Sequence, residues 1–292
     1  MVVALDFSAA YDSVDRESLW KVLEAEGMGP RTLAVLRALG EGTESAVKVG
    51  GKLSSWFRVE EGVRQGSVLS PVLFGALMDW VLREALGPLS DRGVGLAVGE
   101  GDRMVDLDFA DDVFLVASSL ADVEEAVAAV ETVGGRVGLR LNPGKTVWMA
   151  DEAVVGDKLK VAGVDVQRSM ALVYLGSEVD VGGGLAGEVA RRVAAARRAF
   201  WGLRRLWKDR RVSRSVKLRV YAAVVRGALL YATETWPARV ADVRSLEVFD
   251  RWCLRRVVGW TASWGLSNAG LVGMSGLPEL VGVLVVGRMT VL

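Results

Sequence analysis

Apolar and polar positions follow different patterns on the two sides of residue 180. Up to that point, short apolar runs typical of strands alternate with segments of helical spacing. The expected strands are 1–7, 46–49, 56–59, a hairpin within 105–117, 146–150, 159–162 and 171–175. The expected helices are 15–27, 31–39, 70–86 and 120–133. Interleaved hairpins and helices of this kind predict an α+β fold.

Local residue chemistry predicts two helix starts and one turn in this part. Asp15 is expected to cap the first long helix, and Ser70 is expected to cap a later, largely buried one. Pro71 would then occupy the first helical position, where its missing N–H costs nothing. Gly50 and Gly51 are expected to join the two strands that flank them in a hairpin.

A run of three glycines at 182–184 marks a boundary, because the composition changes there. Long helices are expected beyond it at 188–207, 213–236 and 240–258. The predicted organisation is therefore a catalytic α+β domain at 1–180, a basic α-helical domain at 181–260, and an unassigned tail at 261–292.

The zero net charge conceals a strong asymmetry. Residues 1–187 carry 17 basic and 29 acidic side chains, whereas residues 188–260 carry 18 basic and 6 acidic ones. This split suggests an acidic catalytic part joined to a part that faces a polyanion, although solvated helix faces would produce the same count.

Composition narrows the possible chemistry. The chain has 292 residues, 51% of them hydrophobic, with no histidine and a single cysteine. Ser-His-Asp and Cys-His nucleophilic sites and the usual zinc sites are therefore excluded. One cysteine fits a reducing compartment, and neither a signal peptide nor a membrane-spanning run is evident. We expect an intracellular protein, nuclear or cytoplasmic and not secreted, with no membrane partner.

Three carboxylates fall at the ends of apolar runs. Asp111 and Asp112 lie between two apolar stretches, so they are expected at the tip of a hairpin. Asp6 ends another apolar run, at the start of the chain. Each of them alone is compatible with an ordinary strand end or a solvated turn. Three carboxylates on neighbouring strand ends would form a hard-oxygen site suited to Mg²⁺.

Five segments occur in a meaningful order. They are LDFSAAYDSV at 5–14, RQGSVLSP at 64–71, FADD at 109–112, GLRLNPGKT at 138–146 and YLG at 174–176. This series resembles motifs A to E of the reverse transcriptase domain of non-LTR (LINE-type) retrotransposons. Later residues resemble the thumb and the segment after it, notably LYATETW at 230–236, so the resemblance covers about 1–260. It implies a polymerase palm, which is an antiparallel sheet with packed helices, followed by a helical thumb or connector.

The resemblance implies an RNA-directed DNA polymerase that uses two Mg²⁺ or Mn²⁺ ions, an RNA template, a DNA primer and dNTPs. Asp6, Asp111 and Asp112 would hold the metal ions, and the backbone carbonyl of Phe7 would add one oxygen. Lys145 matches the motif D lysine, a candidate general acid for the departing pyrophosphate; a surface lysine in a Pro-Gly turn is the alternative.

Other matching positions imply contacts to nucleotide and template. Tyr11 occupies the position that blocks a ribose 2′-hydroxyl, with a core aromatic as the alternative. Gln65 and Gly66 match the loop that orders the template and the incoming nucleotide, and Gly66 permits close backbone approach. Arg64 is a candidate phosphate contact or an ordinary exposed arginine.

The primer and the thumb complete the set. Tyr174, Leu175 and Gly176 resemble the primer grip, although they could be an ordinary strand end. The thumb-like helices carry a basic stripe that predicts salt-dependent binding to nucleic acid. Its members are Arg191, Arg192, Arg197, Arg198, Arg204, Arg205, Lys208, Arg210 and Arg211. Trp201 and Trp207 interleave with them and are expected to pack between helices.

The chain departs from the family pattern in three ways. It begins at the first motif, so we expect the fingers subdomain to be largely missing. Ala9 stands where relatives commonly have lysine, and neither an endonuclease nor a Cys/His zinc segment is evident. Two hypotheses therefore stay open: a polymerase domain with an intact catalytic centre, or an inactive remnant that only binds nucleic acid.

Overall fold

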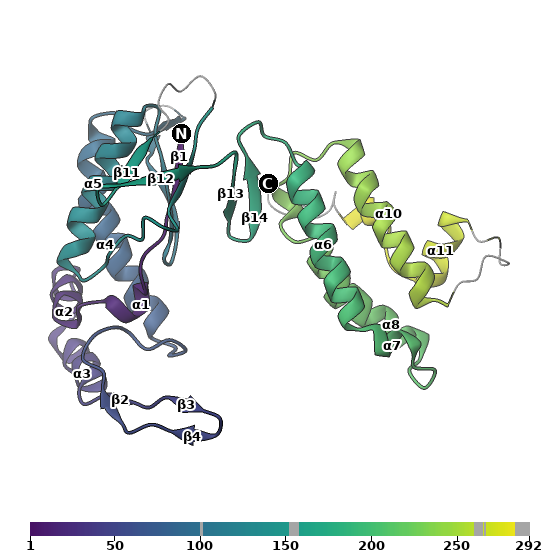
Figure 1. The fold of residues 1–292 in the computed structure, drawn as a ribbon, viewed down its shortest axis with the longest axis horizontal. Helices are drawn as coiled ribbons and strands as arrows, with labels where there is room; N and C mark the ends of the chain where they lie inside the picture. The colour runs from purple at the N-terminus through teal and green to yellow at the C-terminus, as the bar shows by residue number, and fades with distance from the viewer. Residues whose placement is uncertain (100–101, 152–157, 260–264, 266, 284–292) are drawn as a thin grey trace. The chain divides into compact units, whose positions relative to one another are not determined.

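The computed structural model describes residues 1–99, 102–151, 158–259, 265 and 267–283 of the chain (Figure 1). The chain divides into two compact units, Met1–Leu175 and Gly176–Leu292. The first unit mixes strands and helices, and the second is mainly helical (Figure 1). Within the described parts, no helix combines the length and the apolar character that crossing a membrane requires.

A six-stranded sheet organises the first unit, in the order β11-β12-β10-β1-β9-β8. Its central strand β1 (Val2–Leu5) runs antiparallel to β9 (Asp112–Val116) on one side and to β10 (Val147–Met149) on the other. The remaining strands are β8 (Asp106–Phe109), β11 (Leu159–Val161) and β12 (Val164–Arg168). The parallel pairing of β12 with β10 makes the sheet mixed, where a purely antiparallel one was expected.

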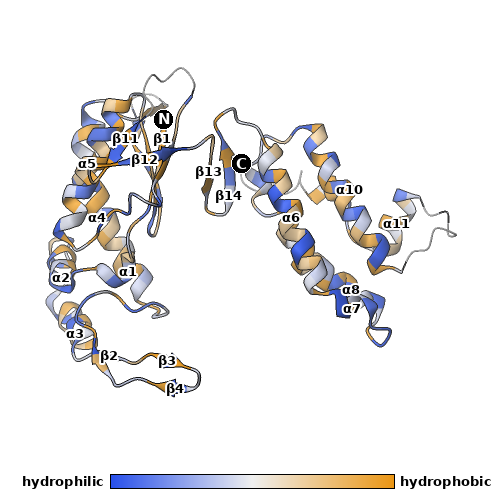
Figure 2. Cartoon of the chain, in the orientation of Figure 1, coloured by the Kyte–Doolittle hydropathy of each residue, from blue (hydrophilic) through white to orange (hydrophobic). Residues whose placement is uncertain are grey.

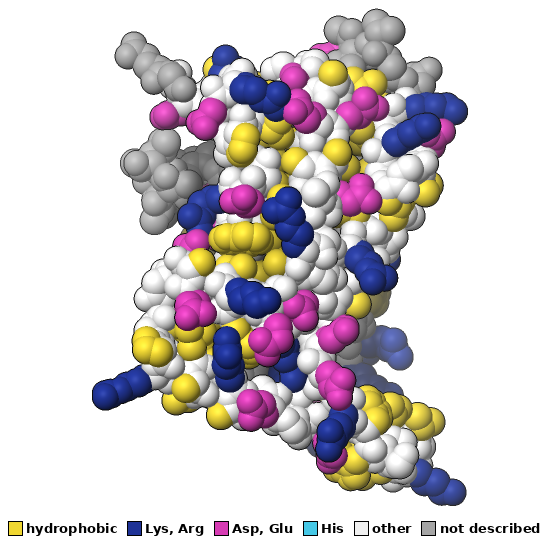
Figure 3. Space-filling model, turned by 90° about the vertical axis from the view of Figure 1, so that its left-hand side faces the viewer, with side chains coloured by type: hydrophobic (Ala, Val, Ile, Leu, Met, Phe, Trp, Pro, Cys, Tyr) yellow, Lys and Arg dark blue, Asp and Glu magenta, His cyan; other side chains and the backbone are white. Residues whose placement is uncertain are grey.

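Two long helices, α4 (Ser70–Asp91) and α5 (Leu120–Arg136), pack on one face of this sheet (Figure 1). Val3 and Leu5 of β1 share one hydrophobic core with the buried faces of these helices. Because side chains alternate along a strand, the neighbours of Val3 and Leu5 in sequence point to the opposite face. On the helix-covered side, acidic and basic side chains are interspersed over the surface (Figure 3).

Three short helices follow β1 in the chain: α1 (Ala10–Ser13), α2 (Arg16–Ala25) and α3 (Pro30–Gly40). Asp15 caps α2 as predicted, because its carboxylate accepts a hydrogen bond of 2.8 Å from the Ser18 backbone N–H. Leu19, Trp20 and Leu23 form the buried face of this helix.

The hairpin around Gly50-Gly51 exists, but its predicted pairing was wrong. β3 (Lys48–Val49) pairs with β4 (Lys52–Leu53) across the two glycines, and β2 (Glu44–Ser45) pairs with β5 (Phe57–Arg58). The two glycines, both with positive φ, form a two-residue turn, so the strands can pair only with their immediate continuations. The two-stranded sheet of β6 (Leu96–Val98) and β7 (Asp102–Met104) was not predicted.

Helix α4 differs at both ends from its predicted span. Ser70 is its first helical residue, and Leu69 occupies the N-cap without a side-chain hydrogen bond. The helix also continues five residues past the predicted end at 86, through Pro88, to Asp91. Leu89 is only 3% exposed. Burial of this last apolar position offsets the single backbone hydrogen bond that Pro88 removes.

Helices dominate the second unit, and β14 (Ser177–Asp180) precedes them. They are α6 (Ala186–Gly202), α7 (Arg204–Lys208), α8 (Arg214–Val220), a π-helical turn Tyr221–Arg226, α9 (Gly227–Leu229), α10 (Val240–Val257) and α11 (Asn268–Ser275). α7 and the start of α8 are strongly hydrophilic (Figure 2).

Two of the three predicted long helices are shorter or interrupted. The predicted helix 188–207 breaks at Leu203, where the Trp207 indole N–H donates a 2.7 Å hydrogen bond to the Phe200 carbonyl. The predicted helix 213–236 ends with α9 at Leu229, and Ala232 has a left-handed φ of 59° that a helix cannot continue through.

A buried polar network joins the π-helical turn to α10. Arg226 makes two hydrogen bonds of 2.8 Å to the Asp250 carboxylate, and the Tyr221 hydroxyl donates a third of 2.6 Å. Arg226 Nη1 also donates to the Pro278 carbonyl at 2.8 Å. Burial and the neighbouring Asp250 charge raise the pKa of Tyr221, and burial raises the pKa of Cys253 to about 12.

We predict that Asp250→Asn destabilises the second unit by about 3–5 kcal/mol, because it leaves the Arg226 guanidinium buried without its counter-charge. Chemical denaturation followed by circular dichroism measures this loss. Glu247→Gln on the same helix is the control: it breaks a partly exposed i,i+4 ion pair with Arg251 and should cost about 0.3–0.5 kcal/mol. Equal losses in the two variants would contradict the prediction.

Candidate active site

The pairing of β1 with β9 places two of the three predicted carboxylates opposite each other. Leu5 is paired with Val113, so the next position of this register puts Asp6 opposite Asp112. Leu5 and Val113 both belong to the core under the helices. The side chains of Asp6 and Asp112 therefore alternate to the other face, which the helices leave open.

The third carboxylate, Asp111, lies in the turn between β8 and β9, as predicted. Phe109 pairs with Asp112, so the turn consists of Ala110 and Asp111 alone. Ala110 has a φ of 59°, a conformation that costs a non-glycine residue roughly 1–2 kcal/mol. This tight turn holds Asp111 at the tip, next to the strand end that carries Asp112.

Asp112 interacts electrostatically with both Asp111 and Asp6. Loss of solvent raises the pKa of Asp112, and the charges of Asp111 and then Asp6 raise it further. The pKa of Tyr11 is also raised, first by burial and then by the Asp111 charge. Asp6 and Asp111 thus lie close enough to Asp112 to affect its protonation, and Asp111 lies close enough to Tyr11 to do the same.

The carboxylate oxygens of this site are ligands of the kind that a divalent cation prefers. Asp6 Oδ2 is buried and accepts no hydrogen bond from any described residue; the ammonium group of Lys145 lies 3.9 Å away. Carboxylate oxygens with an unmet charge are the ligands that Mg²⁺ and Mn²⁺ prefer. In their present rotamers, no three acidic or cysteine side chains of the described residues surround a single point closely enough to hold an ion.

The backbone carbonyl of Phe7 is oriented towards β9, the strand that begins with Asp112. Phe7 forms an isolated bridge with Leu141, in which Ser8 N–H donates to the Arg140 carbonyl at 2.8 Å and Asn142 N–H donates to the Asp6 carbonyl at 2.7 Å. Phe7 is therefore the non-hydrogen-bonded position of that bridge, and its own carbonyl points away from Leu141, to the side of β9.

Tyr11 is held by stacking and by backbone hydrogen bonds. Its ring lies 4.3 Å from that of Phe74 on α4, at an interplanar angle of 14°. The Tyr11 carbonyl accepts a 2.7 Å hydrogen bond from the Val63 N–H. Gly62 passes so close to α1 that an added Cβ would lie 2.7 Å from the Asp12 carbonyl oxygen. The RQGS loop therefore starts in contact with the segment that carries Tyr11.

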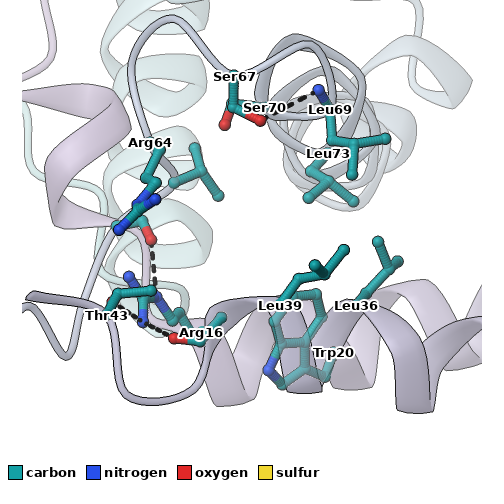
Figure 4. A pocket seen from close by; sticks show the side chains of 13 residues that line it. Arg16, Trp20, Leu36, Leu39, Thr43, Arg64, Ser67, Leu69, Ser70 and Leu73 are labelled. Carbon is teal, nitrogen blue, oxygen red and sulfur yellow. Dashed lines mark hydrogen bonds between the residues drawn. The ribbon is translucent and has the colours of Figure 1, made fainter.

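The predicted loop residues are placed as follows. Gln65 donates to the Asp12 carboxylate at 3.3 Å, which ties it to the same segment. Gly66 has a φ of 85°, but no atom lies within 4 Å of the position its Cβ would take. Glycine is thus required at this position by the backbone conformation and not by contact with other atoms of the protein. Arg64 is exposed at the edge of a small cavity of about 80 Å³ (Figure 4).

Sequence analysis missed Arg16, which anchors this loop. Its guanidinium donates to the carbonyls of Gly62 at 2.8 Å and Gly40 at 2.7 Å, and to the Thr43 hydroxyl at 3.2 Å (Figure 4). No sequence signal marks this role, because an arginine in the first turn of an amphipathic helix has the pattern of an exposed residue.

The predicted primer-grip residues lie on either side of the division between the two units. Tyr174, the last residue of β13 (Ala171–Tyr174), packs on Phe114 of β9 with ring centroids 4.5 Å apart. Burial, and then the charges of Asp108 and Asp112, raise the pKa of Tyr174, so it belongs to the carboxylate neighbourhood. Leu175 and Gly176 both have positive φ, 45° and 79°, as in a tight turn.

In the second unit, a buried carboxylate organises part of the predicted basic stripe. Glu188 lies 2.9 Å from Arg191 Nε and 2.8 Å from Arg192 Nε, and its side chain is fully buried. It also accepts a 2.8 Å hydrogen bond from the Glu178 N–H. Arg191 and Arg192 both donate to the Gly176 carbonyl.

The two tryptophans of the stripe have different environments. Trp207 stacks on Phe200 with centroids 5.3 Å apart, which is the helix packing that was predicted. Trp201 is 48% exposed and lies on α6 among exposed arginines, with its ring 6.0 Å from that of Trp252.

Comparisons with known proteins agree with this arrangement. The sequence model of the family described as "Reverse transcriptase (RNA-dependent DNA polymerase)" matches residues 1–179. A transposon TX1 protein of Xenopus laevis is 32% identical over 176 residues, which are 60% of this chain and 13% of that protein. A Pol polyprotein from the type-1 retrotransposable element R2 of Popillia japonica is 28% identical over 155 residues, 53% of this chain and 25% of that protein.

The fold is shared with a solved structure of telomerase from Candida albicans. The match covers 96% of this chain and 51% of the telomerase chain, with a TM-score of 0.52 and 12% sequence identity. The chain spans a quarter or less of the length of the two retrotransposon relatives.

The chain therefore belongs to the reverse transcriptase family. Its family match includes all five segments that resemble motifs A to E, and its relatives come from non-LTR retrotransposons, as the motif order indicated. The predicted α+β polymerase fold is confirmed.

We predict that Asp112→Asn raises the melting temperature of the first unit. It removes a like charge opposite Asp6, and cross-strand charge pairs are worth about 0.2–1 kcal/mol. The folded state raises the pKa of Asp112, so its ionised form is destabilising above that pKa, and the effect disappears as pH falls towards the ordinary value of 3.8. Thermal melts at several pH values measure it. A gain that persists at low pH, or no gain at neutral pH, contradicts the prediction.

Proposed function

We propose that this chain is an RNA-directed DNA polymerase domain that joins dNTPs to a DNA primer on an RNA template. The observation that carries the proposal is the placement of Asp6 opposite Asp112, with Asp111 in the adjoining turn, in a chain of the reverse transcriptase family. We infer an intracellular protein, since both substrates are nucleic acids.

The carboxylates would bind two Mg²⁺ or Mn²⁺ ions together with the carbonyl of Phe7. Such ions, when bound, activate the attacking 3′-hydroxyl and stabilise the leaving oxygen of the α-phosphate. Asp6, Asp111 and Asp112 would be the residues that hold these ions. Lys145 is exposed and lies 3.9 Å from Asp6, which fits a proton donor to the departing pyrophosphate.

The loop 62–66 and Tyr11 would bind the incoming nucleotide. Tyr11 is stacked on Phe74 and lies near Asp111, which supports a role for its ring in excluding a ribose 2′-hydroxyl. Gln65 and Gly66 would order the template base, and Arg64 would contact phosphate.

Primer binding would involve both units. Tyr174, Leu175 and Gly176 would hold the primer end near the carboxylates, and the basic helices of 181–260 would serve as the thumb. The exposed arginines of α6, Arg197 and Arg198, fit contacts to phosphate. Residues 1–180 would then be the palm.

Primer extension tests the proposal. We expect the chain to extend a DNA primer on an RNA template with dNTPs and Mg²⁺ or Mn²⁺, and Asp111→Asn to reduce extension at least about 100-fold, since one carboxylate supplies much of the metal charge balance. A second protein, in which a fingers segment from a related reverse transcriptase is added to this chain, is tested in parallel. Loss of extension in every form, with salt-sensitive RNA binding retained, would establish the binding-remnant alternative instead.

We predict that Tyr11→Ala raises rNTP incorporation relative to dNTP by at least about tenfold, because shape-based exclusion of one hydroxyl supplies up to about 100-fold discrimination. The ratio of kcat/KM values for a matched rNTP and dNTP measures it. Tyr11→Phe keeps the ring and should leave the ratio unchanged. A Tyr11→Ala ratio equal to that of the wild type would assign Tyr11 to packing alone.

A further inference from the structure

Asp6 lies where β1 leaves its regular pairing. Along β10 the register pairs Ala4 with Val147, and its continuation would place Phe7 opposite Gly144. The partner of Phe7 is instead Leu141, three residues earlier in the chain. The segment between Asn142 and Thr146 therefore loops out of the sheet beside Asp6.

Asn142 stabilises this loop by accepting three hydrogen bonds from it. The Asn142 carbonyl accepts hydrogen bonds from Lys145 N–H at 3.2 Å and Thr146 N–H at 3.0 Å. Its side-chain oxygen accepts a third, of 3.1 Å, from Gly144 N–H. The loop is thus a rigid turn and can serve as a fixed support for its neighbours.

The interrupted ladder leaves one backbone donor of Asp6 without a backbone acceptor opposite it. In an antiparallel pair, the N–H and C=O of one residue point to the same side. The Asp6 carbonyl bonds to Asn142 N–H on the loop side, so the Asp6 N–H points there too. It donates to the Thr146 hydroxyl oxygen, at 3.2 Å.

Thr146 is well placed for this contact. It is 1% exposed, and it directly precedes β10, whose pairing with β1 fixes its position. Its hydroxyl oxygen takes the place of the ladder carbonyl that the loop removes. Both backbone groups of Asp6 are therefore satisfied, by Asn142 N–H and by the Thr146 hydroxyl, and this fixes the backbone from which the carboxylate projects.

We propose that Thr146 is a positioning residue for Asp6: its hydroxyl oxygen, by accepting the Asp6 N–H, aims the Asp6 carboxylate at the metal-binding face. The inference rests on the proposed function only for its effect on polymerisation. Residues that orient metal ligands typically contribute 10–100-fold to metal affinity or activity.

Four variants test this role. Thr146→Val keeps the shape and removes the oxygen, whereas Thr146→Ser keeps the oxygen and removes the methyl group. Thr146→Ala completes a pair with Thr146→Ser that differs in the oxygen alone, which matters if the valine variant does not fold. Thr132→Val is the matched control, because the Thr132 hydroxyl bonds the Ala128 carbonyl on the exposed face of α5.

Three measurements apply to each variant: Mn²⁺ binding by electron paramagnetic resonance, hydrogen exchange of the peptide that contains Asp6, and kcat against KM in primer extension. We expect the variants without the oxygen to bind Mn²⁺ about 10-fold or more weakly and to exchange the Asp6 amide faster. Their kcat should fall with little change in the KM for dNTP. Thr146→Ser and Thr132→Val should match the wild type.

Equal Mn²⁺ affinity in Thr146→Ser and Thr146→Ala overturns the inference, as does a wild type that binds no Mn²⁺. Failure of the proposed function gives a different result: no wild-type extension, while Mn²⁺ binding and amide exchange still distinguish the variants with and without the oxygen.

Discussion

The pairing of β1 between β9 and β10 is the interaction on which the candidate site depends. Its register is fixed by apolar burial, because Val3 and Leu5 must face the core beneath α4 and α5. A slip of one residue would exchange the two faces of the strand and turn Asp6 into that core. The same hydrophobic pattern that stabilises the first unit therefore decides which side the carboxylate faces.

This arrangement gathers like charges that destabilise the folded chain. Burial, and then the charges of Asp111 and Asp6, raise the pKa of Asp112, and the ammonium group of the exposed Lys145 lies 3.9 Å from Asp6. Stability alone would favour amides at these positions, since amides fit strand ends equally well and carry no charge. The proposed binding of divalent cations would explain why three carboxylates occupy these positions.

Local patterns predicted much of this fold, and long-range contacts account for what they missed. Short apolar runs located β1 and β9, and the residue type located the Asp15 cap, since both depend on neighbours in sequence. The parallel pairing of β12, the end of the predicted helix 213–236 at Leu229 and the anchoring role of Arg16 depend on residues far away in the chain. For the site, motif order located the carboxylates, but it carried no information on Thr146 as the acceptor of the Asp6 N–H.

The basic excess of residues 188–260 serves two purposes that a count of charges cannot separate. Arg192 and Arg226 are buried in ion pairs with Glu188 and Asp250, so they neutralise carboxylates inside the unit and are not available to a polyanion. Other arginines, such as Arg197, remain exposed on α6. A buried arginine is held by its ion-pair partner, whereas an exposed arginine can contact phosphate from solution. Only the exposed set should therefore give salt-dependent binding to nucleic acid. The proposed phosphate-binding surface would therefore be smaller than the sequence asymmetry alone suggests.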